Sequence, residues 1–276
     1  MMEAEELLRA GRLDEAQSSL ERAIRSEPAE AKLRIFFSQL LAVLGQWDRS
    51  LTQLKVAAEL DAVHLLMAQM YGGALRCEVL RGQIFAGART PLIFGEPEAW
   101  VGWLVQANAL TAQGKDEAAE ELRQEAFEAA PATAGTIDDH KFEWIADADS
   151  RLGPVLEAIV DGQYYWIPFQ MIREVQVNAP KDLFDLVWVP AEFTWVNHGQ
   201  SPGLIPVRYP SSEESQEDAV RLARKTAWIE RGAGTYLGLG QRMLVTEGQE
   251  YALLSTRRIQ LLQPEKDAGA DGGHDG

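Results

Sequence analysis

Cysteine is nearly missing from this sequence, since Cys77 is the one such residue among 276. A lone thiol cannot form an internal disulfide, and this usage is typical of a reducing compartment. Cys77 lies in an apolar helical stretch, where a small core-filling role is the usual one. The acidic N-terminus, residues 1–6, runs directly into a helical pattern and has none of the features of a signal peptide. We therefore expect a cytoplasmic protein.

Basic residues and long apolar runs are also scarce. Lysine and arginine total 26 against 42 aspartates and glutamates, which gives a formal net charge of −16. This balance argues against nucleic acid or an anionic membrane as the main partner, and it favours a basic partner surface. The most apolar region, 62–85, is interrupted by polar or charged residues: His64, Gln69, Arg76, Glu78 and Arg81. That region is too polar to span a bilayer.

The signatures of common enzymes are missing as well. No serine lies in a Gly-x-Ser-x-Gly elbow, and Cys77 lacks an acid–base context. His64 lies in the apolar helix, His198 in a turn and His274 in the C-terminal tail. The glycine-rich segments near residues 232–240 do not open a phosphate loop with a following lysine. These absences predict a protein without catalytic residues, cofactor or bound metal.

What the chain does have is a repeated helix–turn–helix pattern. One copy turns at Gly11 and a second at Gly45, 34 residues later, with leucine and alanine positions at the same offset. A third copy turns at Gly114 and ends at Pro131, each 103 residues beyond Gly11 and Pro28. A period of about 34 residues with this pattern is the tetratricopeptide signature. The first half is therefore expected to be a helical-repeat domain, residues 1–135.

Such repeats point to protein binding rather than catalysis. Glycine lets the chain turn between antiparallel helices, and a proline ends the second helix because it lacks an amide proton. Stacked pairs leave a concave groove that binds a peptide or helix of another chain. The least regular part of the array is 62–86, and a glycine- and proline-rich loop follows at 87–97. Trp103 lies where the repeat usually carries its bulky aromatic residue.

The second half changes to short β-type runs after a linker at 131–136. One helix is expected at 213–226. The expected strands are 164–168, 172–177, 186–189, 193–196, 204–207, 235–239, 242–246, 251–254 and 258–262. The fold class is thus α then α+β, with tetratricopeptide-like repeats followed by a mostly antiparallel α+β domain, 136–262. The Gly/Asp/Ala-rich tail, 263–276, is expected to be disordered.

Carboxylates gather around aromatic residues between positions 138 and 151. One hypothesis is a metal-dependent hydrolase in which a divalent ion is held by Asp147-x-Asp149 and neighbouring carboxylates: Asp138, Asp139 and Glu143. However, the glycine and the final glutamate of a calcium loop are missing. The alternative that we favour is structural: Asp147 and Asp149 cap a helix at 150–160 and pair with Arg151.

Aromatic and charged residues of these segments are the candidates for contact with a partner. Tryptophan is enriched at interfaces, although most tryptophans of the second half are expected in its core. The candidate partner-binding residues are Trp103, Trp144, Asp147, Asp149, Arg151, Tyr164 and Tyr165.

Several long motifs make the chain resemble the ImpE family, also called TagJ, which are accessory proteins of bacterial type VI secretion. They are FEWIADADSRLGP at 142–154, YYWIP at 164–168, DLVW at 185–188, GLIPVRYP at 203–210 and GLGQR at 238–242. The resemblance covers the chain apart from its tail and implies an interaction protein. Family members are linked to the contractile sheath, whose small subunit offers a helix, and to the hexameric AAA+ ATPase that dismantles the contracted sheath. The resemblance carries over no catalytic residues.

Three functions thus stay open at this point. The leading one is a non-catalytic adaptor that binds a helix of the sheath small subunit and assists the ATPase, as a monomer or weak dimer. The second is the hydrolase described above. The third is a general tetratricopeptide scaffold for an unrelated partner. The partner helix has three possible positions: the repeat groove, the junction between the two halves, and a sheet edge.

Overall fold

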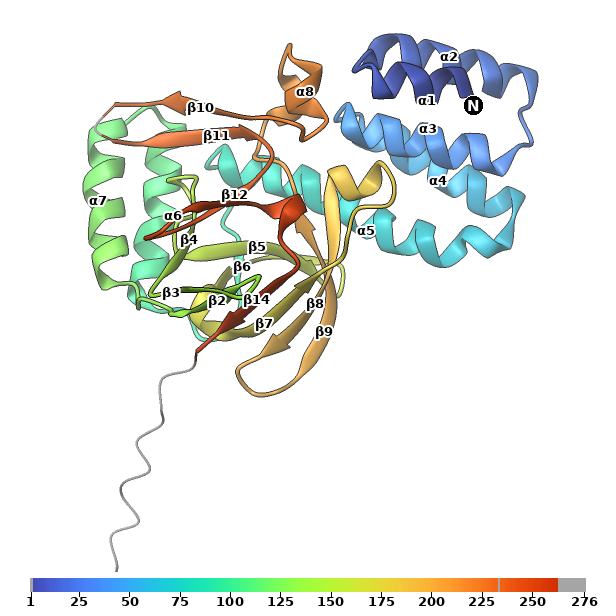
Figure 1. Cartoon of the computed structure of the whole chain (residues 1–276). Coiled ribbons are helices and arrows are strands. Elements are labelled where there is room, and N and C mark those ends of the chain that lie inside the picture. Colours follow the sequence, from blue (N-terminus) through green and yellow to red (C-terminus); the bar gives the residue numbers. More distant parts are fainter. Residues whose placement is uncertain (1, 233, 263–276) are drawn as a thin grey trace, which may run out of the picture.

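The computed structural model describes residues 2–232 and 234–262, so the tail expected to be disordered lies outside the described residues. Stacked helices lead into a sheet-rich region, and α6 and α7 stand on the side of this region away from α1 and α2 (Figure 1). Tetratricopeptide-like helices followed by a mostly antiparallel α+β region were predicted, and this fold class is confirmed. The long helices are α1 (Met2–Arg9), α2 (Leu13–Ser26), α3 (Ala31–Val43), α4 (Trp47–Leu60), α5 (Leu65–Phe85), α6 (Ala99–Ala112) and α7 (Asp116–Ala129).

The three repeat glycines turn the chain in the same way. Gly11, Gly45 and Gly114 have φ angles of 70°, 70° and 71°. After each glycine, the next residue donates its amide to the carbonyl five residues earlier, at 2.8, 2.8 and 3.0 Å. This is the Schellman arrangement, which favours glycine because a Cβ is strained at positive φ. The predicted turns are thus confirmed.

Small and leucine side chains at matching repeat positions pack the array. Ala16 and Leu20 of α2 are fully buried, as are Leu54 and Ala57 of α4. Short side chains let the helices approach closely, and the leucines fill the layer between them. None of the helices in the described residues is long and apolar enough to cross a membrane.

Nine strands of the described chain form one sheet with the order β1–β6–β5–β9–β8–β7–β14–β2–β3. The pairing of β1 with β6 is parallel, and the other pairs are antiparallel. Its strands are β1 (Leu92–Ile93), β2 (Gly135–Ile137), β3 (His140–Phe142), β5 (Val155–Val160), β6 (Gln163–Pro168), β7 (Ile172–Val177), β8 (Trp188–Trp195), β9 (Gln200–Pro206) and β14 (Arg258–Leu261). Asp161 and Gly162, with φ angles of 50° and 72°, form the turn between β5 and β6.

Two smaller sheets complete the second half. The first pairs β12 with β13 and β4, and the second is the hairpin of β10 and β11. Their bounds are β4 (Ile145–Asp147), β10 (Thr226–Glu230), β11 (Tyr236–Gly240), β12 (Met243–Thr246) and β13 (Glu250–Ala252), and the short helix α8 covers Asp218–Arg221.

Two of the helices predicted from the sequence are not present in the structure. Residues 150–154 form a turn, and the rest of the expected helix is strand β5, whose six residues are all buried. A strand that is buried on both sides shows no alternation, which removes the pattern that separates strand from helix. The helix expected at 213–226 is a short 3₁₀ turn, then α8, and Thr226 already begins β10.

Other strand predictions need smaller corrections. The predicted runs at 186–189 and 193–196 are joined in one strand, β8, which covers Trp188–Trp195 and includes the Pro-Ala-Glu segment read as a turn. Leu186 ends a 3₁₀ turn before this strand. Strands β2, β3, β4 and β10 were not predicted, and the loop at 87–97 contains the two-residue strand β1.

One apolar cluster runs through both halves of the chain. It contains Leu40 of α3 and Trp100 of α6 together with Trp166 of β6 and Trp188 of β8. Tyr71 of α5 lies between the halves, and its ring centroid is 6.2 Å from that of Trp188. The two halves therefore share a core, and the domain boundary at 135/136 stays a prediction.

Candidate functional site

The carboxylates of the hydrolase hypothesis are not brought together. Asp138 and Asp139 lie in the turn between β2 and β3, where Asp138 accepts backbone amides of Arg257 and Arg258 at 2.9 and 2.8 Å. Glu143 is exposed, while Asp147 and Asp149 are buried. Within residues 2–232 and 234–262, no three His, Cys, Asp or Glu side chains are grouped so that they hold a metal ion.

Asp149 organises the loop between β4 and β5. Its side chain accepts the backbone amide of Arg151 at 2.8 Å and the Arg151 guanidinium at 2.9 and 2.5 Å. It also accepts the amide of Gly238 at 2.7 Å, which ties the loop to β11. The predicted pairing with Arg151 is confirmed for Asp149 and is wrong for Asp147, which pairs with Arg242 instead. The predicted helix cap is wrong, because the chain enters a strand after this loop.

Asp147 and Glu157 are joined by an arginine. Arg242, between β11 and β12, forms ion pairs with both carboxylates. The second arginine, Arg81 of α5, holds Glu157 from the other side, with contacts of 2.6 and 2.9 Å. All four side chains are almost completely buried. Buried ions are tolerated only when they are paired and hydrogen-bonded, and here each arginine meets two carboxylates, since Arg81 also lies 3.3 Å from Glu78.

Aromatic side chains supply the remaining hydrogen bonds of this cluster. Tyr164 donates its hydroxyl to Glu157, and Trp166 donates its ring N–H to the Tyr164 oxygen at 2.8 Å. Trp188 donates to Glu78 at 2.8 Å. We call Glu78, Arg81, Asp147, Asp149, Arg151, Glu157, Tyr164 and Arg242 the buried charge cluster.

The buried charge cluster shifts the pKa values of its own carboxyl groups in opposite directions. Burial alone would raise the pKa of Glu157, but Arg81 and Arg242 lower it to about 2. Burial raises the pKa of Asp147 to about 6, although Arg242 acts against this rise. Glu157 meets two guanidinium groups and the Tyr164 hydroxyl, whereas Asp147 meets one guanidinium and lies near the carboxylate of Asp149, which raises its pKa further.

A fourth arginine links the helical array to the sheet through backbone carbonyls. Arg208 follows β9, and its guanidinium donates to the carbonyls of Ala42 and Val43 at 3.2 and 2.6 Å, at the end of α3. Cations are favourable there because the last carbonyls of a helix lack partners. The Arg208 carbonyl in turn accepts from Arg81 at 2.8 Å. Arg208 and the buried charge cluster thus connect α3, α5 and the sheets.

The predicted partner-binding residues now separate into two groups. Four of them, Asp147, Asp149, Arg151 and Tyr164, are buried and bonded within the chain. Side chains enclosed in this way stabilise the fold and present little surface, and their part in contact with a partner stays a prediction. Trp103, Trp144 and Tyr165 reach the surface at least in part and stay predictions.

These three aromatic residues lie in different places. Trp103 is half-buried against the shared core. Tyr165 packs edge-on against Phe94 at 5.8 Å. Trp144 is 37% exposed and lines a cavity of about 380 Å³ with Phe127, between the end of α7 and β4. The structure therefore does not bring the aromatic candidates into one site.

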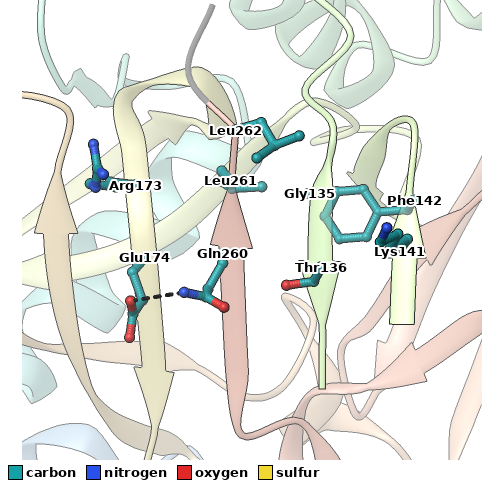
Figure 2. A pocket seen from close by; sticks show the side chains of 9 residues that line it. All are labelled: Gly135, Thr136, Lys141, Phe142, Arg173, Glu174, Gln260, Leu261 and Leu262. Carbon is teal, nitrogen blue, oxygen red and sulfur yellow. Dashed lines mark hydrogen bonds between the residues drawn. The ribbon is translucent and has the colours of Figure 1, made fainter. Parts of the chain in front are cut away.

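A second cavity, of about 680 Å³, lies over the β7–β14–β2–β3 end of the large sheet. Figure 2 shows Glu174 bonded to Gln260 across neighbouring strands, with Phe142 and Lys141 on the opposite side. Glu174 also pairs with Arg258 at 3.0 Å. Its carboxylate is therefore already occupied, and the other charged side chains of the lining are the basic residues Lys141 and Arg173.

Three central residues of this cluster, Arg81, Glu157 and Arg242, were not predicted from the sequence as site residues. A signal for Glu157 was present, since it is the single charge in the apolar run Val155–Val160. A charge within such a run is expected to be paired. The partners come from positions 76 and 85 residues away, and no local pattern specifies them.

Comparisons with known proteins agree with this architecture. A family model described as ImpE protein matches residues 139–260, and one described as tetratricopeptide repeat matches 7–70. The chain is 52% identical over 258 residues to the "Type VI secretion system accessory component TagJ" of Pseudomonas aeruginosa, covering 94% of this chain and 90% of that protein. It also resembles the X-ray crystal structure of a Vibrio parahaemolyticus protein, with a TM-score of 0.87, 26% identity and coverage of 95% and 98% of the two chains.

The fold and the buried charge cluster define a helical-repeat protein whose array is fastened to an α+β region by internal ion pairs. The motifs quoted from the sequence lie in that cluster and around it, and the identity extends over nearly the whole chain. The chain belongs to the ImpE/TagJ family, which confirms the resemblance seen in the sequence.

Proposed function

We propose that this chain is a non-catalytic, cytoplasmic adaptor of a type VI secretion system. It binds a helix of the contractile sheath small subunit and assists the AAA+ ATPase that disassembles the sheath. The observation that carries this proposal is the 52% identity to a type VI secretion accessory component over 94% of the chain. A protein that acts as a monomer or weak dimer fits this role.

The architecture supports an adaptor in two ways. Tetratricopeptide-type arrays are common carriers of peptide- and helix-binding grooves. The two acidic residues of the 147–151 segment, Asp147 and Asp149, form ion pairs within the chain, with Arg242 and Arg151. The chain thus offers binding surfaces, and its most concentrated charges are engaged in holding the fold.

Co-purification tests this function. The tagged chain is mixed with purified sheath subunits from its own secretion system, and separately with sheath subunits and the ATPase. We expect co-elution with the small subunit and faster ATPase-driven disassembly when the chain is present. Absence of the chain from both complexes, with an unchanged disassembly rate, would refute the adaptor role.

A further inference from the structure

The N-terminal half of α5 and the turn before it expose an unusual group of apolar side chains. Leu66 is 77% exposed, Leu65 50% and Met70 47%, and Val63 in the preceding turn is 73% exposed. Apolar residues scattered singly over a surface need no explanation, but a contiguous group of them marks an interaction surface. We call these four residues the α5 ridge.

The α5 ridge lies where the repeat array ends. The tetratricopeptide match stops at residue 70, inside α5. Helix α4 packs against α5, and the buried residues of α5 begin only at Tyr71. The terminal helix of a repeat array usually needs a polar outer face to stay soluble. An apolar face at this position is instead that of an array end on which a further surface packs.

A cleft lies along each side of the α5 ridge. The first, of about 540 Å³, lies between α5 and α4 and is lined by Leu51 of α4. The second, of about 650 Å³, lies between α5 and the large sheet and is lined by Leu204 of β9. Gln69 and Arg76 line both clefts, so the ridge and the clefts form one continuous surface. This surface has a protrusion beside hollows that can receive it, which is the way in which packed helices interlock.

The charged residues around the α5 ridge are of both signs and are unpaired. Lys55 and Glu59 line the cleft beside α4. Asp161 and Glu192 line the cleft beside the sheet, and Arg76 lines both. All five are exposed, and none forms an ion pair or a side-chain hydrogen bond with residues 2–232 or 234–262. Two cations and three carboxylates leave this surface nearly balanced in charge, although the whole chain carries −16.

We propose that a second copy of the chain covers this surface. A twofold dimer brings the same patch of both copies together, so the patch must complement itself. The α5 ridge of each copy packs into a cleft beside α5 of the other, and the cations of each copy, Lys55 and Arg76, face the three carboxylates of the other. A partner of one charge sign would leave some of these charges unpaired, whereas a second copy supplies both signs. This dimer goes beyond the adaptor role and does not depend on it.

Sedimentation equilibrium of the full wild-type chain tests the dimer over a range of micromolar concentrations. We expect the average mass to rise reversibly from that of one chain, 30.6 kDa, toward twice that value. The double variant Leu66→Glu/Met70→Glu should raise the dissociation constant of the dimer about tenfold or more, because it places charges at the centre of the interface. Val79→Glu is the matched control, since Val79 lies on the same helix and is 45% exposed but lines neither cleft. Its dissociation constant should stay within about twofold of the wild-type value.

Two results would overturn the dimer. One is a wild-type chain that keeps the mass of one chain over the whole range, and the other is a wild-type dimer that is unchanged in Leu66→Glu/Met70→Glu. Far-UV circular dichroism establishes that the variants fold. Should the double variant not fold, Arg76→Glu decides: weaker dimerisation supports the proposal because like charges then meet, and unchanged dimerisation overturns it. The adaptor role is tested separately, by co-purification.

Discussion

Glu157 lies at the centre of the buried charge cluster. It accepts from Arg81, Arg242 and Tyr164 and is completely buried. Removing one member of a buried ion pair leaves the other charge without compensation, which costs more than the pair itself contributes. Single residues of the buried charge cluster are therefore expected to matter for stability rather than for contact with a partner.

Replacing Glu157 with glutamine tests this expectation. Glu157→Gln keeps the shape but leaves Arg81 and Arg242 short of one negative charge, and we expect a loss of about 3–5 kcal/mol in the free energy of unfolding. Glu174→Gln is the matched control, because its partner Arg258 has a half-exposed side chain and such pairs contribute about 0–1 kcal/mol. Urea denaturation measures both, and equal losses would contradict the structural role of the cluster.

The same residue predicts a pH dependence. Because the pKa of Glu157 falls from 4.5 to about 2 on folding, its stabilisation is complete above pH 4.5 and is lost as the pH falls toward about 2. The difference in unfolding free energy between wild type and Glu157→Gln should therefore shrink as the pH drops from 7 to 3. The raised pKa of Asp147 changes the free energy of unfolding with pH in the opposite direction. Asp147 is present in both the wild type and Glu157→Gln. A difference that stays constant over this range would argue against the lowered pKa.

At the residue scale, the sequence predicted the Asp149–Arg151 pair because its members are two positions apart. It did not predict the partners of Glu157, which depend on how α5 and the β11–β12 connection meet in space. Seven residues were candidates for partner contact, and four of them turned out to be enclosed. Polar residues in a long motif look alike from the sequence whether they face water or the interior.

At the element scale, regular structure followed from local signals where those signals were strong. The helices of the repeats were predicted because a glycine turn recurs with a fixed offset. Strand β5 was missed because its residues are buried on both faces, and the hairpins near Asp138 and Trp228 because short strands carry little pattern. Helices and strands with a clear hydrophobic period can thus be predicted from the sequence. Strands whose burial depends on contacts with distant segments cannot.

Three glycine-to-alanine changes test the turn geometry. Gly114→Ala should cost about 1–2 kcal/mol from the positive φ alone, since a Cβ there meets open space. Gly45→Ala should cost more, because its Cβ would lie 2.5 Å from the Glu213 Cγ. Gly82→Ala, inside α5 with open space around it, should stabilise by about 0.5–1 kcal/mol. Thermal unfolding ranks the three, and a loss at Gly82 as large as at Gly114 would contradict the account.

At the scale of the whole molecule, the array and the sheet region behave as one structure. The shared apolar cluster joins Leu40 and Trp100 to Trp166 and Trp188, and Arg81 and Arg208 cross between the halves. The sequence correctly indicated helices followed by strands, but the 131–136 linker gave no hint of this common core. The common core of the two halves is formed by contacts between segments that are distant in the sequence.

A shared core predicts cooperative unfolding of the full chain. We expect far-UV circular dichroism, which reports mainly the helices, and tryptophan fluorescence, which reports both halves, to give coincident transitions in urea. Two separated transitions would show that the halves unfold independently and would support the predicted boundary at 135/136 as a boundary between autonomous domains.

The most direct test of the adaptor role is calorimetric titration of the full wild-type chain with a synthetic helix from its own sheath small subunit. The account predicts saturable binding with a dissociation constant on the order of micromolar, about −8 kcal/mol, and no binding of a scrambled peptide of the same composition. Heats that are indistinguishable between the two peptides would contradict it.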